Sequence, residues 1–388
     1  MNILYVSDTF LPSINGIVTN IVDSSTELIK RGHDVSVFTS KINEAGTRSY
    51  SGIRVHRFRS TKRFIHYHDF RLTIPNHFKM SKILGKIKPD VIHAHMPSLL
   101  GWDCLLYAKM NNLPFVATYS TLLPDFLKHS SLEKISKSGL TKEIVWFYTR
   151  LFYNRCDMVI APSETVKKEL ARQGIKKTVV ISFGVNTSKF CCDQHKKIAN
   201  KHSKQIILHV GRLSYEKSVG TLAKAYSLVA KKFPQSQLLI IGDGNQKNKL
   251  INLTKKLGLT KNVKFLGVVE HDKLSKYYSS ADIFASASAI ETEGIVFLEA
   301  MACGLPIIGV NKMGAADLIK DGYNGLLAEP YNYRDLAEKM SKLLWDKKMQ
   351  LKMSRNSLIR VKEYDSNKSV RKLENLYKKL ISEHNRPK

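Results

Sequence analysis

The sequence predicts an α/β protein with two doubly wound domains, each built around a parallel sheet. Short apolar runs alternate with helical patterns along most of the chain, which is typical of parallel β-α-β units. The alternation occurs in two series, separated by a polar, basic stretch. A length of 388 residues with 43% hydrophobic content is enough for two separate cores.

The first series predicts five buried strands with helices between them. The strand-like runs are ILYVS (3–7), DVSVFT (34–39), VIHAH (91–95), PFVAT (114–118) and DMVIAP (157–162). The helical run at 17–32 ends at Gly32, and glycine commonly follows the last residue of a helix. The run VKKELARQG follows Ser163, a favourable N-cap, and ends at Gly174.

The second series repeats this pattern with the runs IILHVG (206–211), QLLIIGDG (237–244), VKFLG (263–267), DIFASAS (282–288) and LPIIGV (305–310). The C-terminal segment has a helical apolar stripe, so we expect an amphipathic helix that packs back on the first domain. The predicted organisation is an N-terminal domain at 1–190, a linker at 191–205, a second domain at 206–360 and the C-terminal helix at 361–388.

The segment ETEGIVFLEAMACGLP (291–306) is the most informative for function. Glu291 closes a loop, and Glu299 lies inside a helix-forming run about a turn and a half further on. Free backbone N–H groups at a helix start attract phosphate, and here they belong to Gly294, Ile295 and Val296. A phosphate with a sugar on each side is a nucleotide-sugar, so the segment predicts a donor site. The alternative is that Glu291 and Glu299 are solvent-exposed charges on a helix and bind no ligand.

Three further features fit a bound diphosphate. Arg212 and Lys217 follow the first strand of the second domain, where a guanidinium and an ammonium would neutralise the departing nucleoside diphosphate. Gly16, at the start of the first helix, lets the backbone approach phosphate closely. Gly242 in IGDG borders the nucleotide pocket or, alternatively, only ends a strand.

The sequence shows no motif for disulfide bonds, metal binding or a membrane span. The five cysteines have no CxxC spacing, and no Asp-x-Asp follows a strand, so we expect no disulfide framework, no metal and no cofactor. The N-terminus lacks a signal peptide, and no apolar run approaches the ~20 residues of a membrane span. We therefore expect a cytoplasmic enzyme, bound peripherally to the inner face of the cell membrane. The sequence carries no signal for an oligomeric state.

The charge distribution supports the membrane expectation. The chain carries 62 Lys and Arg against 33 Asp and Glu, a formal net charge of +29. Between Arg54 and Lys88, ten basic residues and one acid are interleaved with aromatic and aliphatic side chains, a composition that suits an anionic bilayer surface. The predicted membrane-binding residues are Arg57, Arg59, Lys62, Arg63, Phe64 and Ile65. An ordinary solvated face over a core is the alternative.

Four motifs in order carry a family resemblance: Asn15-Gly16-Ile17, GRLSYEK (211–217), IGDG (241–244) and ETEGIVFLEAMACGLPII (291–308). Together they resemble the retaining GT-B glycosyltransferases with a Glu-(seven)-Glu element. YVSDTFLPSINGI (5–17) and TLLPDFLKHSS (121–131) are most similar to the bacterial diacylglycerol glycosyltransferases. The resemblance implies a GT-B fold, with two Rossmann-like domains facing a cleft. It also implies that the domain at 1–190 binds the acceptor and that the domain at 206–360 binds the nucleotide-sugar.

The resemblance also implies a reaction. A retaining, metal-independent enzyme would move a hexose from UDP-glucose or UDP-galactose to a membrane lipid such as diacylglycerol. Glu291 would contact the sugar and Glu299 the ribose, with Arg212 and Lys217 on the diphosphate. For the acceptor we name His95, at the carboxyl end of its strand, together with Ser120 and Asp125. A core histidine is the alternative for His95.

Two departures from the family pattern bear on activity. Ser120 lies where relatives usually carry a histidine, and serine cannot act as a base near neutral pH. MGAAD at 313–317 replaces the usual Gly-Gly pair followed by an acid. A glycosyltransferase with a saccharide acceptor, in surface-polysaccharide or lipopolysaccharide synthesis, is the main alternative. A nucleotide-sugar epimerase is weaker, and a nucleic-acid-binding protein lacks a readout motif.

Overall fold

The computed structural model describes residues 1–13, 15–41, 49–61, 71–120, 139–190 and 204–386. The chain forms two compact units: unit 1 is Met1–Phe183 with Ser366–Lys388, and unit 2 is Gly184–Asp365. Most of the predicted linker, 191–203, lies outside the described residues. The boundary between the units, at Phe183 and Gly184, precedes it.

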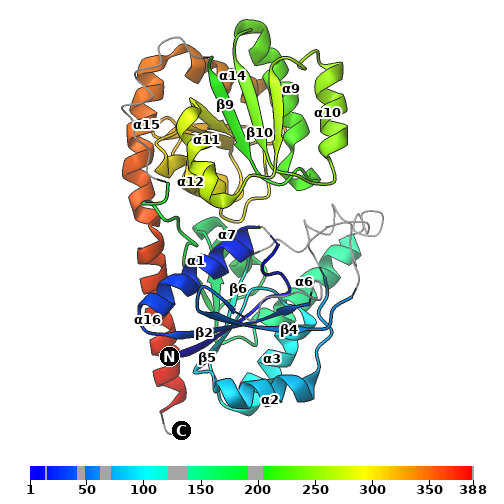
Figure 1. Ribbon diagram of the computed structural model, residues 1–388, viewed down its shortest axis with the longest axis vertical. Coiled ribbons are helices and arrows are strands. Elements are labelled where there is room, and N and C mark those ends of the chain that lie inside the picture. Colours follow the sequence, from blue (N-terminus) through cyan, green and yellow to red (C-terminus); the bar gives the residue numbers. More distant parts are fainter. Residues whose placement is uncertain (14, 42–48, 62–70, 121–138, 191–203, 387–388) are drawn as a thin grey trace. The chain divides into compact units, whose positions relative to one another are not determined.

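Unit 1 is built on a sheet with the strand order β3-β4-β2-β1-β5-β6-β7-β8 (Figure 1). All neighbours are parallel except β3 and β4. The strands are β1 (Asn2–Val6), β2 (Asp34–Ser40), β3 (Ser49–Tyr50), β4 (Ile53–Phe58), β5 (Val91–Ala94), β6 (Phe115–Thr118), β7 (Met158–Ala161) and β8 (Thr178–Val180).

The helices of unit 1 cover both faces of this sheet. They are α1 (Gly16–Lys30), α2 (His77–Ile87), α3 (Leu99–Met110), α6 (Gly139–Tyr153), α7 (Glu164–Arg172) and α16 (Ser366–His384). Helix α16 lies beside α1 (Figure 1). Its apolar stripe joins the core formed by α1 and one sheet face, through Val370, Leu373, Leu376, Tyr377 and Leu380. The C-terminal segment thus completes a layer that the N-terminal half begins.

Unit 2 has an all-parallel sheet with the strand order β11-β10-β9-β12-β13-β14. Its strands are β9 (Ile206–Val210), β10 (Gln237–Ile241), β11 (Val263–Gly267), β12 (Ile283–Ala285), β13 (Ile307–Val310) and β14 (Gly325–Ala328). Its helices are α9 (Val219–Lys232), α10 (Lys247–Lys256), α11 (Leu274–Ser280), α12 (Ile295–Ala302), α13 (Met313–Leu318), α14 (Tyr333–Trp345) and α15 (Lys347–Val361), with short 3-10 turns at Tyr215–Lys217, His271–Lys273 and Lys362–Tyr364.

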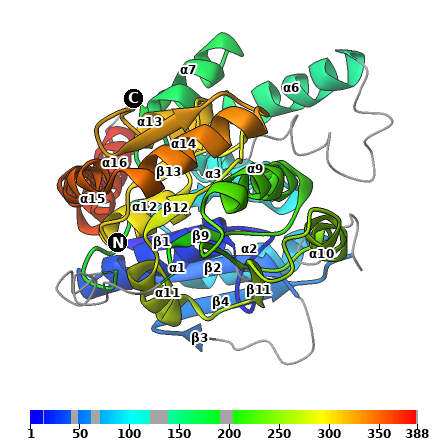
Figure 2. The same ribbon diagram turned by 90° about the horizontal axis from the view of Figure 1, so that it is seen from above.

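Two apolar clusters make unit 2 a three-layer structure. One cluster joins α9, α10 and α14 to one sheet face, and α9 and α14 lie side by side (Figure 2). The other joins α11, α12 and α13 to the opposite face. Alternate residues of a strand point to opposite faces, so neighbours such as Ile207 and Leu208 belong to different clusters. The expected pair of doubly wound α/β units is confirmed.

All ten predicted strands are present, and the sequence missed β3, β4, β8 and β14. Strand β4 is the instructive omission, because it lies inside the segment that we read as an interfacial surface. Phe58 at its end is fully buried, so it packs in the core and does not face a bilayer. No helix in the described part of the chain is long and apolar enough to cross a membrane.

Candidate functional site

The strand order of unit 2 brings two motif-bearing loops together. Strand β9 has β10 on one side and β12 on the other, so the order in which strands are added to the sheet changes direction between β9 and β12, although all the strands are parallel. In parallel sheets, ligands bind outside the carboxyl ends of strands at such a switch point. The loop after β9 carries Arg212 and Lys217, and the loop after β12 carries Glu291.

Lys217 and Glu291 form a direct ion pair across this switch point. The Lys217 Nζ atom donates to Glu291 Oε1 at 2.7 Å, and both side chains are largely buried. Burial opposes ionisation of Glu291, but the Lys217 charge and hydrogen bonds from Lys217 and Ser288 lower its pKa below the ordinary value. Glu291 is therefore a carboxylate, held by a cation that can also meet phosphate.

Arg212 is held in a second pair. Its Nη2 atom lies 3.2 Å from Glu216 Oε1, which also accepts a hydrogen bond from Ser214 at 2.6 Å. Burial opposes ionisation of Glu216 too, yet the adjacent guanidinium and the Ser214 bond lower its pKa. The Arg212 side chain remains 43% exposed, so it can contact a ligand while Glu216 sets its direction.

Gly242 supports the loop that carries Arg212. Its φ of +131° is unfavourable for other residues, and a Cβ atom there would lie 1.9 Å from the Gly211 carbonyl oxygen. Leu213 N–H donates to the Asp243 carbonyl at 2.9 Å, which joins the two loops further. Gly242 therefore has a structural role that accounts for a glycine at this position.

Helix α12 begins at the predicted anion site. Gly294 precedes it with a φ of +84°, and a Cβ atom there would lie 2.5 Å from the Phe297 ring. The Gly294, Ile295 and Val296 amides form the helix start, where backbone N–H groups lack partners within the helix. Gly314 N–H donates to the Glu291 carbonyl at 2.8 Å, so MGAAD braces the glutamate loop despite its departure from the family pattern.

Glu299 lies inside α12 with only 3% of its surface exposed. Its Oε1 atom is 2.7 Å from His271 Nε2, and its Oε2 atom accepts from the Tyr278 hydroxyl at 2.7 Å. Two solvated helix charges are therefore ruled out for Glu291 and Glu299. The structure places Glu291, Arg212 and Lys217 around one pair of loops and Glu299 further along the helix that follows.

Unit 1 presents a different set of candidates. Gly16 starts α1, and Asn15 caps the helix by accepting from Val18 N–H at 3.0 Å. His95 follows β5 and is buried, and neither ring nitrogen has a hydrogen-bond partner among the described residues. Burial lowers the pKa of His95 to about 3, so the ring is neutral. Ser120 is buried after β6, and Asp125 lies outside the described residues.

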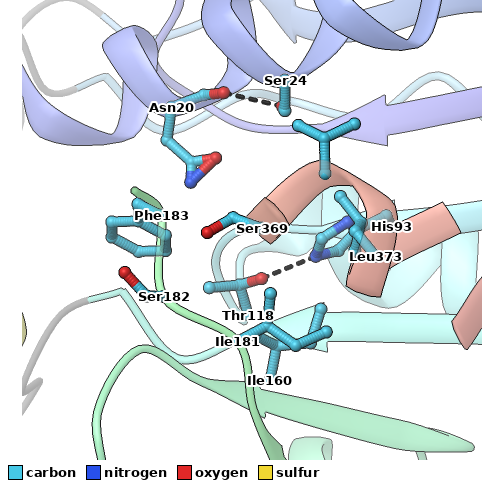
Figure 3. A pocket seen from close by; sticks show the side chains of 11 residues that line it. Asn20, Ser24, His93, Thr118, Ile160, Ile181, Ser182, Phe183, Ser369 and Leu373 are labelled. Atoms are coloured by element: carbon cyan, nitrogen blue, oxygen red, sulfur yellow. Dashed lines mark hydrogen bonds between the residues drawn. The ribbon is translucent and has the colours of Figure 1, made fainter. Parts of the chain in front are cut away.

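His93, two residues earlier, is satisfied on both sides. Its ring nitrogens lie 2.6 Å from the hydroxyl groups of Tyr377 and Thr118. A cavity of about 20 Å³ opens beside it, lined by polar groups from α1, α16 and the segment after β8 (Figure 3). That volume admits about one water molecule and no sugar or acyl chain. His93 is therefore a core residue that helps to attach α16.

The predicted membrane residues divide into two groups. Arg57, on β4, donates to the backbone carbonyls of Leu11 at 2.7 Å and Ser40 at 3.3 Å, which ties its guanidinium to unit 1. Arg59 is exposed just after β4. The other four, Lys62, Arg63, Phe64 and Ile65, lie outside the described residues.

Exposed apolar side chains also lie on α2, α3 and α6. Helix α3 contacts both of the others: Cys104 lies 3.6 Å from Met80 of α2 between sulfur atoms, and Trp102 donates to the Tyr148 hydroxyl of α6 at 3.0 Å. The exposed apolar side chains of these helices include Phe78, Leu99, Leu106, Met110, Ile144 and Phe147, with Phe78 88% exposed. Helix α2 adds exposed Lys79, Lys82 and Lys86. We call this set of residues the α2-α3-α6 face.

Sequence reasoning missed the partners of the predicted residues. Glu216 and Ser214 lie within the quoted GRLSYEK motif and were not assigned, while His271 and Tyr278 lie 28 and 21 positions from Glu299 and carry no local signal. Within the residues that the structure describes, no group of three His, Cys, Asp or Glu side chains is placed to hold a metal ion.

Two family models match the chain. The model described as Glycosyltransferase Family 4 matches residues 14–189, and the model described as Glycosyl transferases group 1 matches residues 193–359. Among solved structures, sucrose-phosphate synthase from Thermosynechococcus elongatus has a TM-score of 0.83 at 22% identity, covering 98% of this chain and 99% of that one. Anabaena HepE in complex with UDP-glucose has a TM-score of 0.76 at 20% identity, covering 97% and 99%.

Three relatives are similar over most of the chain. An alpha-monoglucosyldiacylglycerol synthase from Streptococcus pneumoniae is 29% identical, covering 87% of this chain and 77% of the relative. One from Acholeplasma laidlawii is 27% identical, covering 100% and 99%. A GDP-mannose-dependent alpha-mannosyltransferase from Mycobacterium tuberculosis is 29% identical, covering 84% and 83%. The resemblance predicted from the motifs is confirmed.

Proposed function

This chain belongs to the GT-B glycosyltransferases, and from that premise we propose that it moves a hexose from UDP-glucose or UDP-galactose to a membrane lipid such as diacylglycerol. The observation that carries the donor half is the meeting of Arg212, Lys217 and Glu291 at the switch point of unit 2. The lipid acceptor is supported by the α2-α3-α6 face and by the similarity to two alpha-monoglucosyldiacylglycerol synthases.

The donor would be held by charge and by backbone. Arg212 and Lys217 would neutralise the diphosphate, together with the amides at the start of α12. Glu299 would accept hydrogen bonds from the ribose. HepE, a neighbour in fold, binds UDP-glucose, which favours a uridine donor for this chain.

Transfer would retain the configuration at the anomeric carbon. The bond from that carbon to the diphosphate oxygen breaks, the bond to the acceptor oxygen forms on the same face, and the acceptor proton passes to the departing diphosphate. Positive charge develops on the sugar, and Glu291 is suited to stabilise it because its neighbours keep it ionised. Neutralisation by Arg212 and Lys217 would make a metal ion unnecessary.

The acceptor surface would be the α2-α3-α6 face, with His95, Ser120 and Asp125 nearer the reacting hydroxyl. Exposed lysines and aromatic side chains on neighbouring helices suit anionic headgroups and the acyl boundary. The enzyme would then bind peripherally to the inner, cytoplasmic face of the cell membrane, where nucleotide-sugars are available.

The test identifies the donor and the acceptor independently. The purified chain is incubated with labelled UDP-glucose, UDP-galactose or GDP-mannose, with diacylglycerol in anionic vesicles or with soluble saccharides, and the glycolipid is analysed by NMR for its anomeric configuration. We expect an α-hexosyl lipid from a UDP-sugar. Transfer to saccharides alone would overturn the lipid proposal, and transfer from GDP-mannose alone, as in the mannosyltransferase relative, would overturn the uridine donor.

A further inference from the structure

Both oxygens of Glu299 are engaged by side chains of the same unit. His271 lies at 2.7 Å from Oε1, and Tyr278 donates to Oε2 at 2.7 Å. A carboxylate offers about four lone-pair sites, so roughly two remain for another donor. Because Glu299 is almost fully buried, these two partners decide where its remaining lone pairs point.

Lys189 sets the tautomer of His271. Its Nζ atom lies 2.9 Å from His271 Nδ1 and 2.7 Å from Asp272 Oδ1. A lysine ammonium only donates, so Nδ1 must accept, and the ring hydrogen is then on Nε2, which donates to Glu299. The result is a directed chain of hydrogen bonds from Lys189 through His271 to Glu299.

The segment that carries Lys189 is itself held in place. The Phe190 ring packs at 5.4 Å from the His271 ring and at 5.9 Å from the Tyr278 ring, between centroids. The Phe190 carbonyl accepts from Cys303 Sγ at 3.1 Å. Lys189 therefore reaches His271 from a segment anchored on α11 and α12.

We propose that His271 and Tyr278 are positioning residues for the Glu299 carboxylate, and that Lys189 keeps His271 as a neutral Nε2–H donor. This inference rests on the proposed function, in which Glu299 holds the ribose of the donor. Holding the carboxylate from two sides fixes its plane, so that its remaining lone pairs meet the ribose hydroxyls.

The role of Lys189 predicts a dependence on pH. The charged or titratable groups around His271 are Lys189 from the entering segment, Glu299 from α12, and Glu270, Asp272 and Lys273 beside it in the chain. Without Lys189, no ammonium faces Nδ1, so a proton at this atom would no longer be opposed, and the neighbouring carboxylates of Glu299 and Asp272 would favour the charged ring. A histidinium would pair with Glu299 and compete with the ribose hydroxyls.

The test uses the full chain and calorimetric titration with UDP and GDP. The tighter nucleotide is carried forward with its 2′,3′-dideoxy analogue, at pH 5.5, 6.5 and 8. We expect His271→Phe and Tyr278→Phe to weaken binding roughly tenfold, the size of losing one hydrogen bond to a charged group. His271→Gln should restore most of the affinity, because its amide can accept from Lys189 and donate to Glu299.

Lys189→Met should bind normally at pH 8 and several-fold more weakly at pH 5.5, while the wild type and the Lys273→Met control vary little. Thermal melting verifies that each variant is folded. If the wild type does not distinguish the nucleotide from its dideoxy analogue, Glu299 does not hold the ribose, and the proposed donor site fails. If it does, but neither His271→Phe nor Lys189→Met behaves as described, the positioning inference alone is overturned.

Discussion

The two units treat the polar groups at their strand ends in opposite ways. In unit 2, the charged side chains at these strand ends are paired: Lys217 after β9 pairs with Glu291 after β12, and Arg212 pairs with Glu216 within the loop after β9. In unit 1, His95 is buried without a partner for either ring nitrogen within the described residues, and the neighbouring helices expose apolar side chains. The proposed nucleotide site of unit 2 thus consists of paired charges, whereas the proposed acceptor surface of unit 1 exposes apolar side chains.

The largest expected effect tests the charge pairing of unit 2. Lys217→Ala removes the cation that we propose binds the diphosphate and leaves Glu291 buried without its partner, so turnover should fall roughly a hundredfold or more. Lys224→Ala, an exposed lysine on α9, is the matched control and should keep wild-type turnover. Steady-state kinetics of the two variants measure their turnover relative to the wild type. Normal turnover of the Lys217 variant would contradict the proposed binding of the diphosphate by Lys217.

The next effect tests the surface of unit 1. Changing Lys79, Lys82 and Lys86 on α2 to Glu should reduce binding to anionic vesicles by about a hundredfold, since each basic residue contributes about 1 kcal/mol. Higher salt should also weaken wild-type binding, but not abolish it, because the apolar side chains are not screened. Vesicle flotation of this variant is compared with that of a control in which three lysines of unit 2 are changed to Glu, namely Lys255, Lys256 and Lys261. Equal flotation of both variants would make α2 an ordinary solvated helix.

The two glutamates should separate binding from rate. Glu299→Gln changes the proposed ribose contact and should raise the donor KM roughly tenfold with a smaller effect on kcat. Glu291→Gln removes the negative charge that we propose lies beside the reacting sugar, and it should lower kcat by more than it changes KM. Initial rates across donor concentrations separate the two. Similar effects on both constants in both variants would contradict the assigned roles.

A smaller effect concerns how α16 is attached to unit 1. Glu374 meets Lys378 at 2.6 Å and both Arg31 and His33 at 3.3 Å. The Lys378 hydrogen bond, followed by those from His33 and Arg31, holds its pKa at about 2, against the usual carboxyl value. Because the folded pKa is lowered, the stabilisation is complete above roughly pH 4.3 and is lost as pH falls towards 2.

Glu374→Gln should therefore lower the free energy of unfolding by about 1 kcal/mol at pH 7, and by less as the pH approaches 2. Glu383→Gln, further along α16 and more exposed, should have almost no effect. Urea titrations at pH 7 and pH 3 measure both. A loss that is the same at both pH values would mean that the carboxylate charge does not hold α16.

The smallest effect concerns backbone strain at the residue that follows Lys217. Ser218 has a φ of +49°, which is unfavourable for a residue with a Cβ atom. Ser218→Gly should raise the free energy of unfolding by about 0.5–1 kcal/mol. Ser227→Gly, inside α9, should lower it by a similar amount. Thermal melting compares them, and a destabilising Ser218→Gly would show that the side chain matters more than the strain.

Local sequence patterns predicted ten of the fourteen described strands and the motifs of the candidate site. Apolar periodicity identifies strands such as 206–210, and glycine and serine at helix ends identify α7, where Ser163 caps by accepting from Val166 N–H at 3.4 Å. Glu291 with Glu299, and Arg212 with Lys217, were recognisable because each pair lies within one short segment. Local propensity and spacing encode such features without knowledge of the fold.

The tertiary structure alone decided which distant residues meet. Lys217 and Glu291 are 74 positions apart, and they pair because β9 lies next to β12 in the sheet. His271 contacts Glu299 because the fold of unit 2 brings together two segments that are distant in the sequence. Phe58 is buried because β4 pairs with β2. A periodic pattern specifies that a strand exists but not its neighbours, since strand order depends on how all the apolar faces are covered together.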